Sequence, residues 1–254
     1  MTIPRLAIAL ALVPVMGQAW HDPVHAAITR AALESLPQPM RARWEPQARE
    51  LAEIYSLYPD AFAHVKDAER QRMLPFCTRP DGGAIHNVTW NVTQDFASLE
   101  YTLNGIIAGL RSGNRDKALQ HAGVLAHFLE DSTCPAHALL PKDVQFQSLR
   151  ELIPPPAGWE NASLHSAIER SSPPFDLGAR APQAAGDAVP AAATALLDRV
   201  YTQVKLNRAR VIDLVRAVYA NDLAKVDAER VRAARIGAEV LADAFYTAFV
   251  LAEK

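Results

Sequence analysis

The sequence predicts an all-α protein, a single domain built as a helical bundle with long connecting loops. Half of its 254 residues are hydrophobic, which is enough to bury one sizeable core. The chain has only 11 glycines, fewer than a turn-rich β protein needs, and its alanine-, leucine- and arginine-rich stretches favour helices. Apolar residues also recur at steps of three and four, as at Ala193, Leu197, Val200 and Val204.

Prolines, glycines and asparagines mark the expected ends of the helices. We expect a turn at 57–60 and a loop at 74–85, because the second segment contains prolines and a Gly-Gly pair. Asn221 and Asp222 are expected to separate the last two helices. The expected helices span 24–36, 44–55, 61–72, 95–110, 117–130, 162–170, 190 to the break at 221, and 226–251.

The first 19 residues have the pattern of a signal peptide. Arg5 supplies the positive charge, 6–16 is an apolar run too short to span a membrane comfortably, and Gly17-Gln18-Ala19 offers small residues for cleavage. We therefore expect cleavage after Ala19, a mature domain of residues 20–254, and a secreted or periplasmic location. Losing Arg5 changes the formal net charge from −2 to −3, which gives no bulk attraction to duplex nucleic acid.

The chain has two cysteines, Cys77 and Cys134. In an oxidising compartment they could form a disulfide, and the alternative is two buried, reduced thiols. The sequence does not choose between these alternatives, because it does not give the distance between the two residues.

Two histidine–carboxylate pairs occur at helical spacing. His127 precedes Asp131 by four residues, and His165 precedes Glu169 by four, so each pair lies on one helix face. His137 follows six residues after Asp131. A single pair of this kind is usually an ordinary surface or core feature, but the set supplies the nitrogen and oxygen ligands that zinc accepts. We therefore expect a metal site that does not need the cysteines.

These residues, with two more histidines and a tryptophan, resemble the zinc-dependent phospholipase C family. That family shares its fold and a trinuclear zinc site with single-strand-specific zinc nucleases. The resemblance spans residues 20–169 and includes Trp20-His-Asp-Pro-Val-His25, with Trp20 at the expected mature N-terminus, and His86 after the glycine-rich loop. In the family, the amino group and carbonyl of such a tryptophan bind zinc.

The resemblance implies three zinc ions, with Asp131 bridging two of them in a cleft of the helical domain. A carboxylate suits that position because it offsets the repulsion between two close cations. The implied further ligands are Trp20 and His25 for the first zinc, His86, His127 and Asp60 for the second, and His137, His165 and Glu169 for the third.

Asp60 is also the candidate catalytic base that would position the attacking water. It precedes His86 by 26 positions, which is longer than the family pattern, so Asp67 and Asp81 compete for the role. A plain helix N-cap is a further alternative for Asp60. Glu130 adjoins Asp131, and we expect its side chain to point off the ligand face. His64 and His121 are expected to be surface or structural residues.

The implied activity is hydrolysis of phosphate diesters by zinc-activated hydroxide. Glu169 and the turn Ser132–His137 resemble the phospholipase branch, which would act on phospholipid in transient contact with a membrane surface. The short spacing from Trp20 to His25 resembles the nuclease branch, which would take single-stranded nucleic acid. A non-catalytic zinc-binding helical protein is the alternative of another class. No stable protein partner is implied. Aromatic residues that could hold a base or a choline headgroup are Tyr55, Tyr58, Phe76, Trp90 and Trp159.

Overall fold

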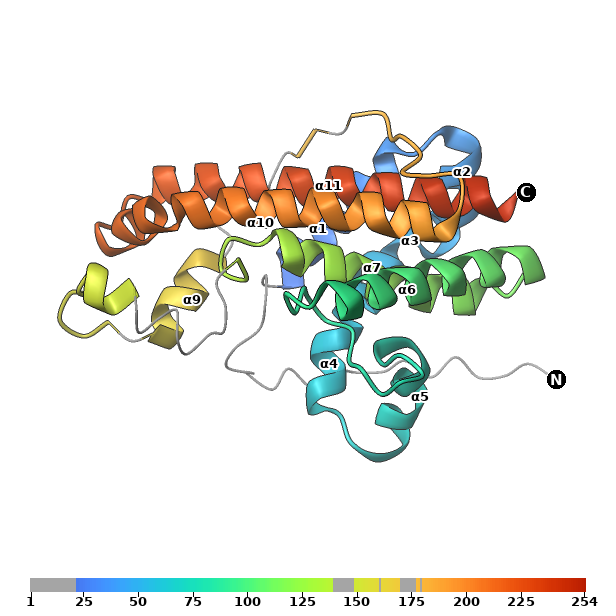
Figure 1. The fold of residues 1–254 in the computed structure, drawn as a ribbon, viewed down its shortest axis with the longest axis horizontal. Coiled ribbons are helices and arrows are strands. Elements are labelled where there is room, and N and C mark those ends of the chain that lie inside the picture. The colour runs from blue at the N-terminus through green and yellow to red at the C-terminus, as the bar shows by residue number, and fades with distance from the viewer. Residues whose placement is uncertain (1–21, 139–148, 160, 170–176, 179) are drawn as a thin grey trace.

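The computed structural model describes residues 22–138, 149–159, 161–169, 177–178 and 180–254, and this part of the chain is all-α (Figure 1). Its one extended pairing is an isolated bridge between Thr78 and Ala84. The helices are α1 (Asp22–Ser35), α2 (Gln38–Trp44), the 3-10 helix η1 (Glu45–Gln47), α3 (Ala48–Glu53), the 3-10 helix η2 (Tyr55–Leu57), α4 (Tyr58–His64), α5 (Asp67–Cys77), α6 (Val92–Ser112), α7 (Arg115–Thr133), α9 (Asn161–Glu169), α10 (Val189–Tyr219) and α11 (Leu223–Ala252).

Local capping residues set the ends of the long helices. The Asn91 side chain caps α6 by accepting a hydrogen bond from a backbone N–H, and Asn114 caps α7 in the same way. Gly113 ends α6 in the left-handed conformation at a φ of 69°, which a residue without a Cβ adopts at little cost. Asp222 caps α11, directly after Asn221 at a φ of 56°. The predicted break between the last two helices is therefore confirmed.

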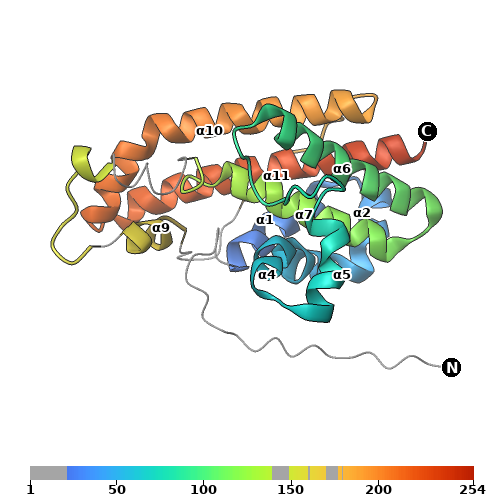
Figure 2. The same ribbon diagram turned by 60° about the horizontal axis from the view of Figure 1, so that its bottom comes forward.

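The helices form a bundle around α7. The long helices α10 and α11 lie side by side, and the α6–α7 hairpin packs along them (Figure 1). Helix α7 also contacts α1, α3 and η2, so it lies between these N-terminal helices and the C-terminal pair α10 and α11. Helices α4 and α5 cover one side of the hairpin, while α9 packs against α10 and α11 (Figure 2). The predicted class, an all-α single domain, is confirmed.

Two clusters of buried apolar side chains hold the bundle together. The larger cluster includes the aromatic side chains of Trp44, Phe128 and Phe245, each essentially inaccessible to water. The smaller cluster includes Ile28 of α1 and Ile168 of α9. Burial of each large apolar side chain stabilises the fold by roughly 1.5–3 kcal/mol. The C-terminal half of α7 lies where the two clusters meet, because Leu129 belongs to the first and Cys134, just after the helix, to the second.

Several boundaries differ from the sequence-based expectation. Residues 57–60 are not a turn, because α4 begins at Tyr58 and places Pro59 in the first turn, where a missing N–H is tolerated. The expected loop at 74–85 is helical as far as Cys77, with Pro75 inside α5. The expected helix 61–72 is interrupted at Val65, and 44–55 is divided into short helices. Tertiary packing overrides the local proline and glycine signals in these segments.

Both cysteines are buried free thiols in this structure. Cys77 belongs to the larger cluster and Cys134 to the smaller one. The alternative of two reduced thiols therefore describes the structure, and the disulfide is not formed.

None of the described helices is both long enough and apolar enough to cross a membrane.

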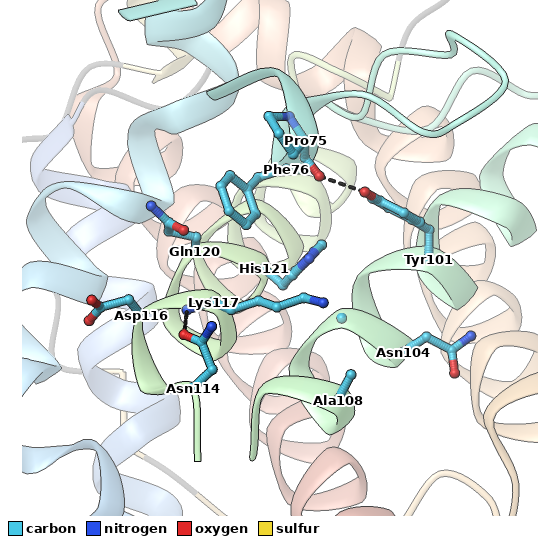
Figure 3. Close-up of a pocket in the computed structure, with 11 residues that line it drawn as sticks. Pro75, Phe76, Tyr101, Asn104, Ala108, Asn114, Asp116, Lys117, Gln120 and His121 are labelled. Atoms are coloured by element: carbon cyan, nitrogen blue, oxygen red, sulfur yellow. Dashed lines mark hydrogen bonds between the residues drawn. The ribbon is translucent and has the colours of Figure 1, made fainter. Parts of the chain in front are cut away.

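A pocket of about 650 Å³ opens beside α5, α6 and α7 (Figure 3). His121 lies in it between the rings of Phe76 and Tyr101, at centroid distances of 5.0 and 5.4 Å. The side chain is buried, so His121 is a structural residue rather than a surface one. The residues that line this pocket include none of the expected metal ligands.

Candidate metal centre

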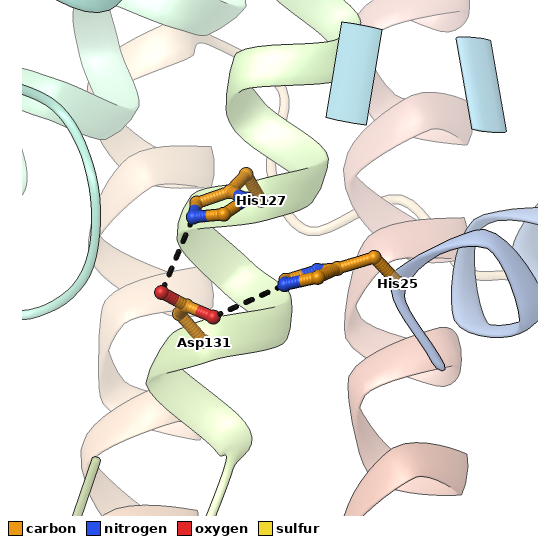
Figure 4. A group of neighbouring side chains, drawn as sticks. All are labelled: His25, His127 and Asp131. Carbon is orange, nitrogen blue, oxygen red and sulfur yellow. Dashed lines mark ion pairs between the residues drawn. The ribbon is translucent and has the colours of Figure 1, made fainter. Parts of the chain in front are cut away.

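Helix α7 places a buried aspartate between histidines from two different helices (Figure 4). His127 lies one turn before Asp131, and its Nε2 is 3.2 Å from Asp131 Oδ2. His25 of α1 approaches from the other side, with its Nε2 3.5 Å from Asp131 Oδ1. All three side chains are 0% exposed. The two oxygens of one carboxylate thus face two different imidazoles, which is the arrangement that a bridging ligand requires.

His86 and Asp60 complete the side of the cluster around Asp131 Oδ2. His86 Nδ1 lies 3.2 Å from that oxygen, and His86 Nε2 lies 2.9 Å from Asp60 Oδ1. Asp60 Oδ1 is also 3.8 Å from His127 Nε2. The group of Asp60, His86 and His127 therefore faces one small volume.

The structure distinguishes Asp60 from its competitors. Leu57 occupies the N-cap position of α4, and Asp60 lies three residues later, within the first turn. The N-cap alternative for Asp60 is therefore wrong. Asp67 is exposed, and Asp81 is exposed and paired with Arg79. Of the three aspartates, Asp60 alone contacts the histidine cluster.

Two buried histidines have their Nδ1 atoms occupied by acceptors outside the cluster. His25 Nδ1 donates to Glu130 Oε2 at 2.6 Å, and Thr29 Oγ1 donates to the other oxygen of the same carboxylate at 2.6 Å. His127 Nδ1 donates to the backbone oxygen of Ser56 at 2.7 Å. With the Nδ1 atoms donating to these acceptors, both Nε2 atoms face the shared aspartate. Histidines that bind metals are held by this kind of outer contact.

Several buried polar atoms in the cluster have no hydrogen-bond partner among the described residues. Buried polar groups in folded proteins are nearly always satisfied, so each unsatisfied atom requires an explanation. A divalent cation would satisfy them together, and a set of imidazole nitrogens and carboxylate oxygens suits zinc. The atoms are His25 Nε2, His127 Nε2, Asp60 Oδ2 and both carboxylate oxygens of Asp131.

Electrostatics in the cluster favour ionised carboxylates. Burial acts to raise the pKa of Asp131, but His127, His137 and His86 outweigh it and hold that pKa well below its ordinary value. Burial likewise acts to raise the pKa of Asp60, but its hydrogen bond with His86 and the nearby His127 lower it. Burial lowers the pKa of His127, whereas Asp131, Asp60 and Glu130 raise it to about 9. The site therefore presents anionic oxygen at neutral pH.

A second group of candidate ligands lies where α9 meets the turn after α7. His165 Nε2 is 2.6 Å from Glu169 Oε1, and His137 Nε2 is 3.2 Å from the same oxygen. His137 Nδ1 is hydrogen-bonded to the side-chain amide of Asn87 at 2.6 Å. The rings of His137 and His86 have centroids 6.3 Å apart, so the second group borders the first.

Cys134 belongs to this second group, which the sequence analysis did not anticipate. Its sulfur and one ligand atom each of His137 and Glu169 all lie within 4.8 Å of one another. The sequence signal was present, because Cys134-Pro-Ala-His137 places a thiol and an imidazole, both zinc-ligand types, only three positions apart. Burial, Glu169 and Asp131 raise the pKa of the thiol, while the N–H groups of Ala136 and His137 act to lower it.

The structure brings together the expected ligands that lie in its described part. Trp20 and the expected cleavage site lie outside the described residues. Glu130 and Ser56 hold histidines of the cluster, and sequence reasoning missed both. We expected Glu130 to point off the ligand face, and only the packing of α1 against α7 reveals its contact with His25.

Comparison of the chain with protein-family models, with curated proteins and with solved structures found no match.

Proposed function

We propose that this chain is a zinc-dependent phosphodiesterase that is exported and hydrolyses phospholipid headgroup phosphodiesters in the manner of a phospholipase C. One observation carries the proposal. Both oxygens of the fully buried Asp131 lack hydrogen-bond partners among the described residues, and they face His25 on one side and His127 on the other. The nearest imidazole nitrogens are 3.2–3.5 Å away, so both oxygens remain open to cations, which would lower the cost of burying this carboxylate.

The donor set supports a pair of adjacent metal sites that share Asp131. His25 would hold one ion, together with the N-terminal group of Trp20 that the family resemblance implies. His86, His127 and Asp60 would hold the other. Bound zinc ions would lower the pKa of a water molecule towards neutrality and offset the negative charge of a phosphate diester.

Exposure around the cluster indicates the side from which substrate reaches it. The His86 side chain is 35% exposed, whereas those of His127 and Asp131 are fully buried. Asp60 lies beside His86, and its Oδ2 has no hydrogen-bond partner among the described residues. An ionised Asp60 in this position can orient the attacking water and accept its proton.

Neighbouring side chains occupy the Trp90 ring, so it is not free to stack on a nucleic-acid base or to hold a choline headgroup. Trp90 is the aromatic residue nearest in sequence to His86, and a nuclease would need such a ring free to stack on a base. Its ring is stacked on Tyr201 at a centroid distance of 5.7 Å, and the Arg208 guanidinium lies 3.9 Å from its centroid. These partners compete with a base for the faces of the ring.

The test uses protein that is exported and processed by its host, so that Trp20 is the terminus if cleavage occurs as expected. Zinc content is measured on the same sample that is assayed against phosphatidylcholine and against single-stranded DNA. Asp131→Asn should lose bound zinc and at least about 100-fold of the hydrolysis rate. Asp213→Asn, at an exposed aspartate paired with Arg216, is the control and should keep both.

Each outcome bears on the proposal. Phosphocholine release that a chelator abolishes supports the phospholipase C activity. Nucleotide release in its place assigns the site to a single-strand nuclease. Zinc bound without hydrolysis of either substrate overturns the proposal in favour of a non-catalytic zinc protein, and protein that binds no zinc overturns it altogether.

A further inference from the structure

Cys134 occupies a position that the proposed phosphodiesterase chemistry does not use. Its side chain is fully buried at the C-terminal end of α7, in the smaller apolar cluster. A buried cysteine is usually an inert apolar residue. Here, however, the sulfur lies within 4.8 Å of ligand atoms of both His137 and Glu169.

Ligand atoms of Cys134, His137 and Glu169 converge on one small volume, and His165 adjoins it through Glu169. Glu169 Oε1 is contacted by His137 Nε2 at 3.2 Å and by His165 Nε2 at 2.6 Å. Glu169 is 2% exposed and His165 is 4% exposed, so these groups are almost entirely withdrawn from water. A buried cluster of imidazole, carboxylate and thiol groups is the donor set of a tetrahedral zinc site.

We infer that Cys134 is a ligand of the third metal ion, which therefore has four protein ligands: Cys134, His137, His165 and Glu169. This inference rests on the proposed metal-binding function and deepens it. A zinc ion with four protein ligands has no open position for water or substrate, so it is structural rather than catalytic. Hydrolysis is then the task of the two ions that share Asp131.

A closed site in this place has a mechanical consequence. Cys134 and His137 lie in the turn after α7, whereas His165 and Glu169 lie on α9. The ion would therefore cross-link α9 to the end of α7, beside His86. A thiolate ligand also changes the selectivity of the site, because sulfur favours zinc, cobalt and cadmium over magnesium or calcium.

The test is spectroscopic and uses the complete, processed protein loaded with Co²⁺ under reducing conditions. A thiolate bound to Co²⁺ gives an intense charge-transfer band in the near ultraviolet that nitrogen and oxygen ligands do not give. The chain has only two cysteines, so Cys77→Ser leaves Cys134 as the sole thiol. We expect the band in wild-type protein and in Cys77→Ser, and its loss in Cys134→Ser with more than about 100-fold weaker binding of one ion.

The outcomes separate this inference from the proposed function. Metal-loaded wild-type protein that hydrolyses a phosphodiester but shows no charge-transfer band overturns the inference alone. A band that persists in Cys134→Ser and disappears in Cys77→Ser also overturns it. If no metal binds to wild-type protein, both proposals fail. In Cys77→Ser, Cys134 is the only thiol left, so a band in that variant assigns the ligand to Cys134. The test therefore holds even if Cys134→Ser does not fold.

Discussion

Glu130 positions the His25 ring, a role that no pattern in the sequence indicates. Its carboxylate is fully buried, and it accepts hydrogen bonds from His25 and from Thr29. By holding the His25 ring in one tautomer, it presents Nε2 to the shared aspartate. Glu130 thus acts through His25 and is a positioning residue.

Replacement of Glu130 by glutamine should weaken metal binding at the His25 site. The neutral amide is a poorer partner for the imidazole N–H, and such outer-contact changes cost roughly 10–100-fold in metal affinity. The measurement is zinc affinity by competition with a chromophoric chelator. The charge-matched control is Glu34→Gln, at an exposed glutamate of α1, the helix that also carries His25. Equal affinities for the two variants would refute the role of Glu130.

The buried side chain of His121 makes the free energy of unfolding depend on pH. Burial lowers the pKa of His121 to about 4 from an ordinary 6.5, and the nearby Lys117 adds to the effect. Above pH 6.5 the imidazole is neutral in both states, so it has no effect on the free energy of unfolding. As the pH falls from 6.5 towards 4, the unfolded chain takes up a proton that the folded chain excludes, so stability decreases.

The expected loss from His121 is at most about 3 kcal/mol over that pH range. His121→Leu should flatten the decrease in the free energy of urea unfolding between pH 7 and about pH 4. His64→Leu, at an exposed histidine, should keep the wild-type slope. An unchanged slope in His121→Leu would show that other groups cause the acid destabilisation.

At the scale of elements, the position of η2 against α7 determines where His127 points. Ser56 of η2 accepts the His127 Nδ1 hydrogen, and the neighbouring Tyr55 packs directly on Gly123 of α7. A Cβ at Gly123 would lie 2.4 Å from the Tyr55 carbonyl carbon. The glycine is therefore required for the close approach that brings Ser56 to the histidine.

Gly123→Ala should destabilise the fold by roughly 1–3 kcal/mol or more, because backbone atoms of η2 cannot move aside cheaply. It should also weaken zinc binding, since η2 would shift away from His127. The comparison variant is Gly237→Ala in α11, where the one contact closer than 3.4 Å is the Thr133 hydroxyl, which can rotate. Urea unfolding and zinc titration check both variants, and equal stability of the two would disprove the argument.

At the scale of the whole molecule, the metal ions should stabilise the fold. The proposed ligands come from α1, α4, α7, α9 and the loop that contains His86, so bound ions would connect elements from both apolar clusters. An ion that binds only the folded state contributes about 2.7 kcal/mol at a free concentration 100 times its Kd. Without ions, the neighbours of the buried Asp131 carboxylate include three imidazole nitrogens at 3.2–3.5 Å.

Removal of metal should therefore lower the thermal midpoint of the protein. For a chain of this size, 2.7 kcal/mol corresponds to roughly 5–10 °C. Scanning calorimetry with and without a strong chelator measures the shift. Asp131→Asn should show a smaller shift, because it has lost a shared ligand. A chelator that leaves the wild-type midpoint unchanged would show that no ion contributes to the folded state.

Much of the molecule could be predicted from local sequence. The all-α class follows from composition and from apolar residues at steps of three and four, because helical periodicity is a property of neighbouring residues. The same reasoning placed His127 with Asp131 and His165 with Glu169, since residues four apart on a helix share a face. The break at Asn221 and Asp222 was equally local, as it depends on backbone conformation and capping.

Tertiary structure alone decided which side chains meet across the bundle. The contact between Glu130 and His25 joins residues 105 positions apart, and that between Asp60 and His86 joins residues 26 apart. No local pattern distinguishes Asp60 from Asp67, or makes Cys134 a neighbour of Glu169. These choices depend on how α1, α4 and α9 pack against α7, because long-range contacts form only when apolar faces are buried together.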